Sequence, residues 1–150
     1  MSSPPAARSA TGLEYLLGII RGEFPGVPIG DTLGFRVVEA EKGRVALLGL
    51  PDKRSYNLIG SVHGGWAAAI LDSALALSAL STLAADQGFT TVDIRINYLR
   101  PLTVDTGEVR AEGKVLQAGR KLAYCEARLT DGAGKLICHG TGSCLILPRS

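Results

Sequence analysis

The sequence lacks any run of like charges and carries little net charge. Its 16 Lys and Arg residues nearly balance 14 Asp and Glu residues, which leaves a formal net charge of +2. Surfaces that bind nucleic acids gather Lys and Arg into a patch or stripe. The sequence therefore predicts no nucleic-acid partner.

Cysteine is scarce as well, and the three cysteines are Cys125, Cys138 and Cys144. Their number is odd, and no Cys-x-x-Cys pair suggests a disulfide framework or a zinc site. His139 follows Cys138, so on a strand the two side chains point to opposite faces and do not share a metal. The first ten residues lack the apolar core of a secretory signal. These features predict a cytoplasmic protein with reduced, buried cysteines.

Long apolar runs are also few, and segment 66–85 is long enough to span a bilayer. Asp72 lies within it, and Ser73, Ser78 and Ser81 add further polar groups. A central Asp costs roughly 2.5 to 3.5 kcal/mol on membrane insertion. We therefore expect no membrane association and interpret the segment as part of a helix in the protein interior.

What the sequence does contain is enough apolar material for one core. It has 150 residues, of which 46% are hydrophobic, so we predict a single domain over residues 11–150 after a flexible tail over residues 1–10. Thr11 can cap a short helix over residues 12–21, which the prolines of residues 24–28 end. Apolar alternation and turn residues predict strands at 33–40, 44–50, 91–98, 109–115, 122–130 and 136–147.

Residues 62–85 form the longest helical segment and follow the second predicted strand. Ala and Leu dominate the segment, and Ser61 is placed to cap it. Apolar residues occur on every side, so the helix should be buried, most simply by a sheet wrapped around it. The predicted fold class is therefore α+β. It has a curved antiparallel sheet of five to six strands around one long central helix, with a short N-terminal helix.

The strand over residues 91–98 shows a clear alternation of period two, which predicts a half-buried strand. Its apolar face holds Val92, Ile94, Ile96 and Tyr98, and its polar face holds Thr91, Asp93, Arg95 and Asn97.

A carboxylate and the residues that open its helix suggest chemistry. Asp72 in an apolar segment is costly to ionise unless it is paired, protonated or kept for function. His63, Gly64 and Gly65 lie at the helix start, where free N–H groups and the helix dipole suit an oxygen anion. The glycines let a ligand approach the backbone, although relief of crowding beneath the sheet would also explain them.

Two strings of residues carry a resemblance to a known family. Residues 57–65 read NLIGSVHGG and are followed by Asp72, and residues 92–101 read VDIRINYLRP. Together they resemble the PaaI branch of the hotdog-fold thioesterases, over roughly residues 30–147. The resemblance implies a hotdog fold and hydrolysis of acyl-CoA without a metal or redox cofactor. It also implies dimers that usually pair into tetramers.

The resemblance implies that Asp72 is the nucleophile or general base and that the Gly64 amide polarises the thioester carbonyl. Helix geometry adds a constraint of its own. The two residues are eight positions apart, which separates their backbones by roughly 12 Å along one helix. If both act on one carbonyl, Asp72 must meet the Gly64 of another copy of the chain, and the sites lie at a subunit interface.

Supporting roles are also implied by the resemblance. His63 and Asn57 match residues that shape the site and help to position water or the carbonyl. Thr91, or the adjacent Thr90, matches a residue that positions the water.

Four further residues are candidates for binding the substrate. Gly65 allows close approach to the backbone, and Trp66 lies at a position where it would line the acyl pocket. Arg120 and Lys121 lie in a predicted turn, where they would contact the phosphates of CoA. The sequence leaves two alternatives open. Trp66 could simply be a core residue, and Arg120 and Lys121 could lie in a hairpin turn that contacts only solvent.

Two other functions remain open on the same fold. The chain could bind acyl-CoA without hydrolysing it, as a sensor or pathway accessory, although such a protein has no evident need for Asp72. An enoyl-CoA hydratase would place Asp and His close together, whereas His63 precedes Asp72 by nine residues.

Overall fold

The computed structural model describes residues 9–149 of the chain. Most of the expected tail, residues 1–8, therefore lies outside the described residues. The helices are α2 (Gly12–Ile20), α3 (Pro28–Leu33) and α4 (Gly64–Leu80), with short 3-10 turns at Lys53–Ser55 and Val104–Thr106. The strands are β1 (Phe35–Glu41), β2 (Arg44–Gly49), β3 (Gln87–Tyr98), β4 (Val109–Ala118), β5 (Leu122–Thr130) and β6 (Leu136–Pro148).

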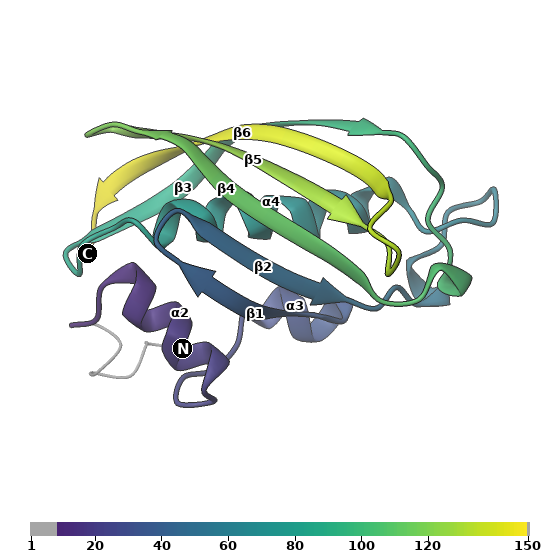
Figure 1. Ribbon diagram of the computed structural model, residues 1–150, viewed down its shortest axis with the longest axis horizontal. Coiled ribbons are helices and arrows are strands. Elements are labelled where there is room, and N and C mark those ends of the chain that lie inside the picture. The colour runs from purple at the N-terminus through teal and green to yellow at the C-terminus, as the bar shows by residue number, and fades with distance from the viewer. Residues whose placement is uncertain (1–8, 150) are drawn as a thin grey trace.

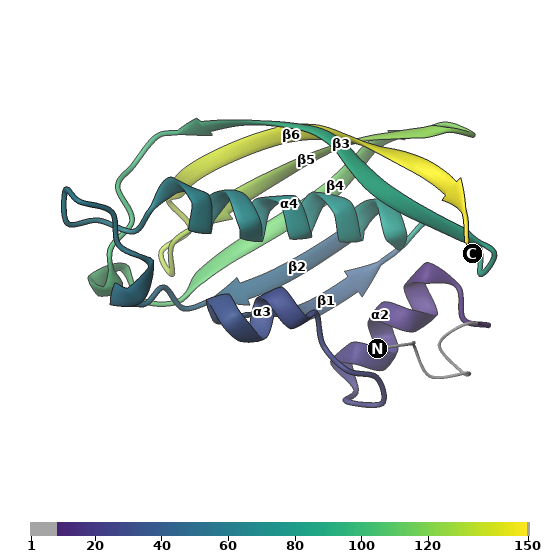
Figure 2. The ribbon, with the colours of Figure 1, turned by 180° about the vertical axis from the view of Figure 1, so that it is seen from behind.

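All six strands form one antiparallel sheet in the order β1-β2-β4-β5-β6-β3. The sheet curves around α4, which lies along its concave face (Figures 1 and 2). This is the hotdog arrangement that the sequence predicted. No helix among residues 9–149 is long and apolar enough to span a membrane.

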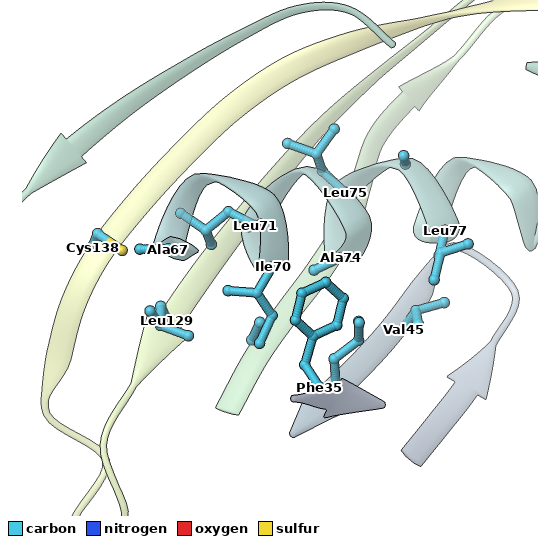
Figure 3. Packing of buried hydrophobic residues seen from close by; sticks show 14 of the residues in the cluster. Phe35, Val45, Ala67, Ile70, Leu71, Ala74, Leu75, Leu77, Leu129 and Cys138 are labelled. Atoms are coloured by element: carbon cyan, nitrogen blue, oxygen red, sulfur yellow. The ribbon is translucent and has the colours of Figure 1, made fainter. Parts of the chain in front are cut away.

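The core lies between α4 and the concave face of the sheet (Figure 3). Ile70, Leu71 and Leu75 of the helix are fully buried there. Gly113 of β4 permits this close packing, because a Cβ atom at that position would lie 2.0 Å from the Ala74 carbonyl oxygen. The backbone of β4 therefore packs directly against the backbone of α4 at this point, and no larger residue would fit.

The N-terminal helix α2 forms as predicted and is fixed at its first turn. Thr11 and Glu14 make a reciprocal capping box at its start. The Gly12 N–H donates to the Leu83 carbonyl, which ties α2 to the segment after α4. Leu16 anchors the helix with a fully buried side chain.

The long helix is shorter than predicted at both ends. Val62 is held extended by a bridge to Tyr56 and by an N–H bond to Leu102, so the helix begins at Gly64 and its cap is His63, not Ser61. At the other end the hydroxyl groups of Ser81 and Thr82 donate to carbonyls of the last turn, and the helix ends at Leu80. These side-chain bonds compete with continuation of the helix.

One short helix was missed, and strands β3 and β4 are longer than predicted. Helix α3 begins with Pro28 in its first turn and ends at Gly34, which has a left-handed backbone with φ of 78°. Proline at the start and glycine at the end are the usual signals for such a helix. Strand β3 begins at Gln87, four residues before the predicted start.

Two surfaces of this chain lack cover from its described residues. Strand β3 is a sheet edge, and it exposes apolar side chains such as Val92, which is 59% exposed. On α4, one stripe is only half buried, at Ala68, Ala69, Asp72 and Ser73. The prediction that α4 is buried on every side is therefore wrong for the single chain.

Candidate active site

Asp72 lies in the third turn of α4, on the half-buried stripe. Its Oδ1 accepts a hydrogen bond from the Thr91 hydroxyl at 2.9 Å. No Lys, Arg or His between residues 9 and 149 makes a salt bridge to this carboxylate. One carboxylate oxygen is thus oriented by a hydroxyl group, and the side chain stays accessible.

A β-bulge brings Thr91 to Asp72. Thr91 pairs with Cys144, and Asp93 pairs with Ser143, so Val92 has no partner on β6. The extra residue reverses the alternation, and Thr91 faces the helix together with Ile94, rather than sharing a face with Asp93. The predicted polar face of this strand is therefore wrong at Thr91, whereas Thr90 points away from Asp72.

The start of α4 presents one free backbone amide. The Nδ1 atom of His63 accepts a hydrogen bond from the Gly65 N–H at 2.8 Å. The Gly64 N–H, by contrast, has no hydrogen-bond acceptor among residues 9–149. It is a donor at the positive end of the helix dipole, which suits a developing oxyanion.

Tyr98 holds the same turn of the helix, a contact that the sequence interpretation missed. Its hydroxyl group donates to the Gly64 carbonyl oxygen at 2.8 Å. Burial raises the pKa of Tyr98, with a smaller contribution from Cys138, so the hydroxyl remains protonated as a donor at neutral pH. The alternation that placed Tyr98 on the apolar face could have indicated this contact, since that face looks onto the helix.

A cavity of about 600 Å³ opens beside the Gly64 amide. The residues that line it include His63, Gly64, Tyr98, Arg100 and Ile59. The cavity gives a ligand access to the start of α4 with a cation nearby.

Asn57 organises the loop that precedes α4. Its side-chain oxygen accepts hydrogen bonds from the Ile59 and Ser61 N–H groups, and its Nδ2 donates to the Ser61 hydroxyl. Gly60 completes the turn with φ of 84°. Within one chain the Asn57 side chain shapes the loop, and contact with water or substrate stays a prediction.

Trp66 lies away from this cavity. Its indole N–H donates to the Leu33 carbonyl at 2.8 Å, and its side chain is 3% exposed. The structure supports the alternative that Trp66 is a core residue. The prediction that it lines the acyl pocket is therefore not retained.

Arg120 and Lys121 are exposed in the turn between β4 and β5. Figure 1 shows this turn at the opposite end of the sheet from the start of α4. Their contact with CoA stays a prediction.

The Gly64 amide and the Asp72 carboxylate do not lie close together within one chain. Gly64 and Asp72 lie on the same straight helix, so about 12 Å separates their backbones along the axis. Among the described residues, no three side chains of the kinds that bind metals lie close enough together to hold a metal ion.

Comparison with known proteins identifies the family of the chain. A family model described as "Thioesterase superfamily" matches residues 59–138, which include Gly64, Asp72 and Thr91. Among curated relatives, human acyl-coenzyme A thioesterase 13 is 31% identical over 105 residues, which are 69% of this chain and 74% of that protein.

Solved structures similar to this chain are also described as thioesterases or as proteins of phenylacetic acid degradation. A putative thioesterase of Ralstonia eutropha, described as related to phenylacetic acid degradation, is 26% identical with a TM-score of 0.79, covering 87% of this chain and 98% of that one. A variant of the phenylacetic acid degradation protein PaaI from Thermus thermophilus is 27% identical with a TM-score of 0.72, covering 79% and 98%.

Proposed function

This chain belongs to the thioesterase superfamily and is a thioester hydrolase of the hotdog fold, and we propose that acyl-CoA is its substrate and Asp72 its catalytic carboxylate. The observation that carries the proposal is the state of Asp72. It is half buried, its Oδ1 accepts a hydrogen bond from the Thr91 hydroxyl, and it makes no salt bridge with the described part of the chain. A purely structural aspartate in an apolar helix would be sealed by a cation or by several donors.

The Gly64 amide is the proposed donor to the thioester oxygen. It lies at the first position of α4, and its N–H is free because His63 binds the next amide instead. As the carbonyl carbon becomes tetrahedral, negative charge develops on its oxygen and strengthens this hydrogen bond. Either Asp72 takes a proton from the attacking water and returns it to the departing sulfur, so that the acid and the CoA thiol form directly, or Asp72 itself attacks the carbonyl carbon. In the second case CoA leaves as a thiolate that takes a proton from water, and a water molecule then hydrolyses the acyl-aspartate anhydride to the free acid and the Asp72 carboxylate.

These two groups would come from different copies of the chain. The 12 Å between them excludes a site within one chain, while two copies related by a twofold axis would form two equivalent sites. The 12-residue free edge of β3 and the uncovered stripe of α4 are the proposed contact surfaces. A long unpaired edge strand is a ready template for pairing with another chain.

The substrate class is tested by thiol release. Purified protein is incubated with a panel of short, medium and aromatic acyl-CoAs and a thiol reagent. Hydrolysis releases free CoA, and Asp72→Asn should lower kcat by about 10² to 10⁴ while leaving binding largely intact. Binding without thiol release by the wild-type protein would favour the acyl-CoA-binding alternative, and an unchanged kcat in the variant would remove Asp72 from the mechanism.

The shared site is tested by complementation. Chains carrying Asp72→Asn are co-expressed with chains carrying Gly64→Pro, which lacks the N–H group. Random pairing makes about half of the dimers mixed, and each mixed dimer keeps one complete site, so about a quarter of wild-type activity should return. If both groups acted within one chain, the mixture would stay inactive.

A further inference from the structure

Behind the Thr91 hydroxyl lies a buried thiol with no assigned role. Cys144 is directly opposite Thr91 across the β6–β3 pair. Both side chains face the helix side of the sheet, and opposite residues of such a pair have Cβ atoms about 4.5 to 5.5 Å apart. Cys144 is 0% exposed and lies within hydrogen-bond reach of the Thr91 side chain.

The direction of the hydrogen bonds follows from counting protons. The Thr91 hydroxyl has one proton, and it donates that proton to Asp72 Oδ1. Toward Cys144 the Thr91 oxygen can therefore only accept, and the thiol must be the donor. The hydrogen bond with Cys125 and burial raise the pKa of Cys144 and outweigh the lowering effect of the Thr91 hydroxyl, so the thiol keeps its proton at neutral pH.

The chain of contacts continues and returns to the helix. Cys144 contacts Cys125 of β5, which in turn contacts the Ser78 hydroxyl of α4. Ser78 donates its proton to the Leu75 carbonyl, so it too can only accept from its thiol neighbour. The two thiols are 0% and 1% exposed, so they shield this side of Thr91 from bulk solvent.

We propose that Cys144 is a positioning residue that holds the Thr91 hydroxyl in the orientation in which it donates to Asp72. By accepting the S–H group, the Thr91 oxygen has its lone pairs directed toward β6 and its proton directed toward α4. The thiol never touches the substrate, and its effect on the reaction runs through Thr91 alone. The inference rests on the proposed function only in that Asp72 is taken as the catalytic carboxylate.

The test compares two buried thiols of the same strand. Cys144→Ala removes the donor, and we expect kcat to fall about 2- to 10-fold with KM unchanged, the range of one hydrogen bond. Cys144→Ser restores an O–H donor and should recover most of that loss. Cys138→Ala removes an equally buried thiol of β6 that pairs with Tyr98 instead, and it should keep the wild-type kcat.

A second pair of variants separates positioning from general loosening of the core. In a Thr91→Val background the hydroxyl is gone, so adding Cys144→Ala should lower kcat no further. A further fall in that background, or an equal fall in Cys138→Ala, would overturn the proposal.

A readout without turnover keeps this inference distinct from the proposed function. In protein labelled at threonine, three-bond couplings to the Thr91 methyl group report its side-chain rotamer. We expect one rotamer in the wild-type protein and in Cys144→Ser, and rotamer averaging in Cys144→Ala. Unchanged couplings in Cys144→Ala would refute the positioning role even if no acyl-CoA in the panel were hydrolysed.

Discussion

Replacing Gly64 with proline removes one backbone N–H group and puts the Cδ atom of the proline ring in place of the amide hydrogen. Gly64 is the first residue of α4, where proline is the favoured residue because its missing N–H has no helical partner anyway. The preceding residue, His63, has φ of −58° and ψ of 135°, the extended conformation that proline requires before it. No hydrogen bond of the described chain uses the Gly64 N–H, so none is lost.

The expected magnitude follows from the role of that N–H group. Loss of one donor to an oxyanion lowers kcat by about 10² to 10³, or roughly 2.7 to 4 kcal/mol of transition-state stabilisation. The new Cβ atom is a separate effect, because it would lie 3.2 Å from the Tyr98 ring and displace it slightly. Gly64→Ala adds the same Cβ atom and keeps the N–H, so it is the matched control.

The assay measures kcat for both variants on the best acyl-CoA of the panel, with the free energy of unfolding from urea titration. Gly64→Ala should lose only a small part of the wild-type kcat, and Gly64→Pro should lose about 10²-fold more. Both variants should unfold at nearly the same urea concentration. Equal kcat values for the two variants, with folding intact, would refute a catalytic role for this amide.

Three other predictions concern residues that pack against or hold α4 and the site. Gly113→Ala should lower the free energy of unfolding by about 3 kcal/mol because the new methyl group collides with the backbone of α4, whereas Gly132→Ala, which meets open space, should change it little in urea titrations. Burial raises the pKa of Cys138 to about 11 from an ordinary value of 9.0. Between these values the unfolded chain releases the proton first, so the free energy of unfolding should fall as pH rises, and by less in Cys138→Ala. Tyr98→Phe removes the hydroxyl group that holds Gly64 and should lower kcat about 2- to 10-fold with little change in stability, as steady-state kinetics would show.

The sequence predicted the architecture well because the signals were local and redundant. Six alternating segments and one apolar helix leave few arrangements other than a sheet wrapped around that helix. Helix α2 was placed to within one residue because Thr11 and Glu14 form a capping box that depends on neighbouring residues alone. Where a boundary depended on distant partners, the prediction failed, as at Val62, whose backbone is held by Leu102.

The parts of the site also divide into those with a local signal in the sequence and those that depend on residues far apart in the chain. The string from Asn57 to Gly65 could be identified by its resemblance to a known family, and Asp72 because a carboxylate is unusual in an apolar helix. The bulge at Val92 could not be predicted, because strict alternation continues through it in the sequence and only the pairing with β6 reveals the shift. The contact between Tyr98 and Gly64 likewise joins residues far apart in the chain.

Because α4 carries one group of each proposed site, a movement of this helix would affect both sites of a dimer. One helix carries the amide of one site at its first residue and the carboxylate of the other site two turns later. A sliding or tilting motion of this rod would improve the geometry of one site at the expense of its neighbour, which is a mechanical route to negative cooperativity. Gly113 lies closed against the backbone of the helix at Ala74, just after Asp72, and this contact would limit such a motion.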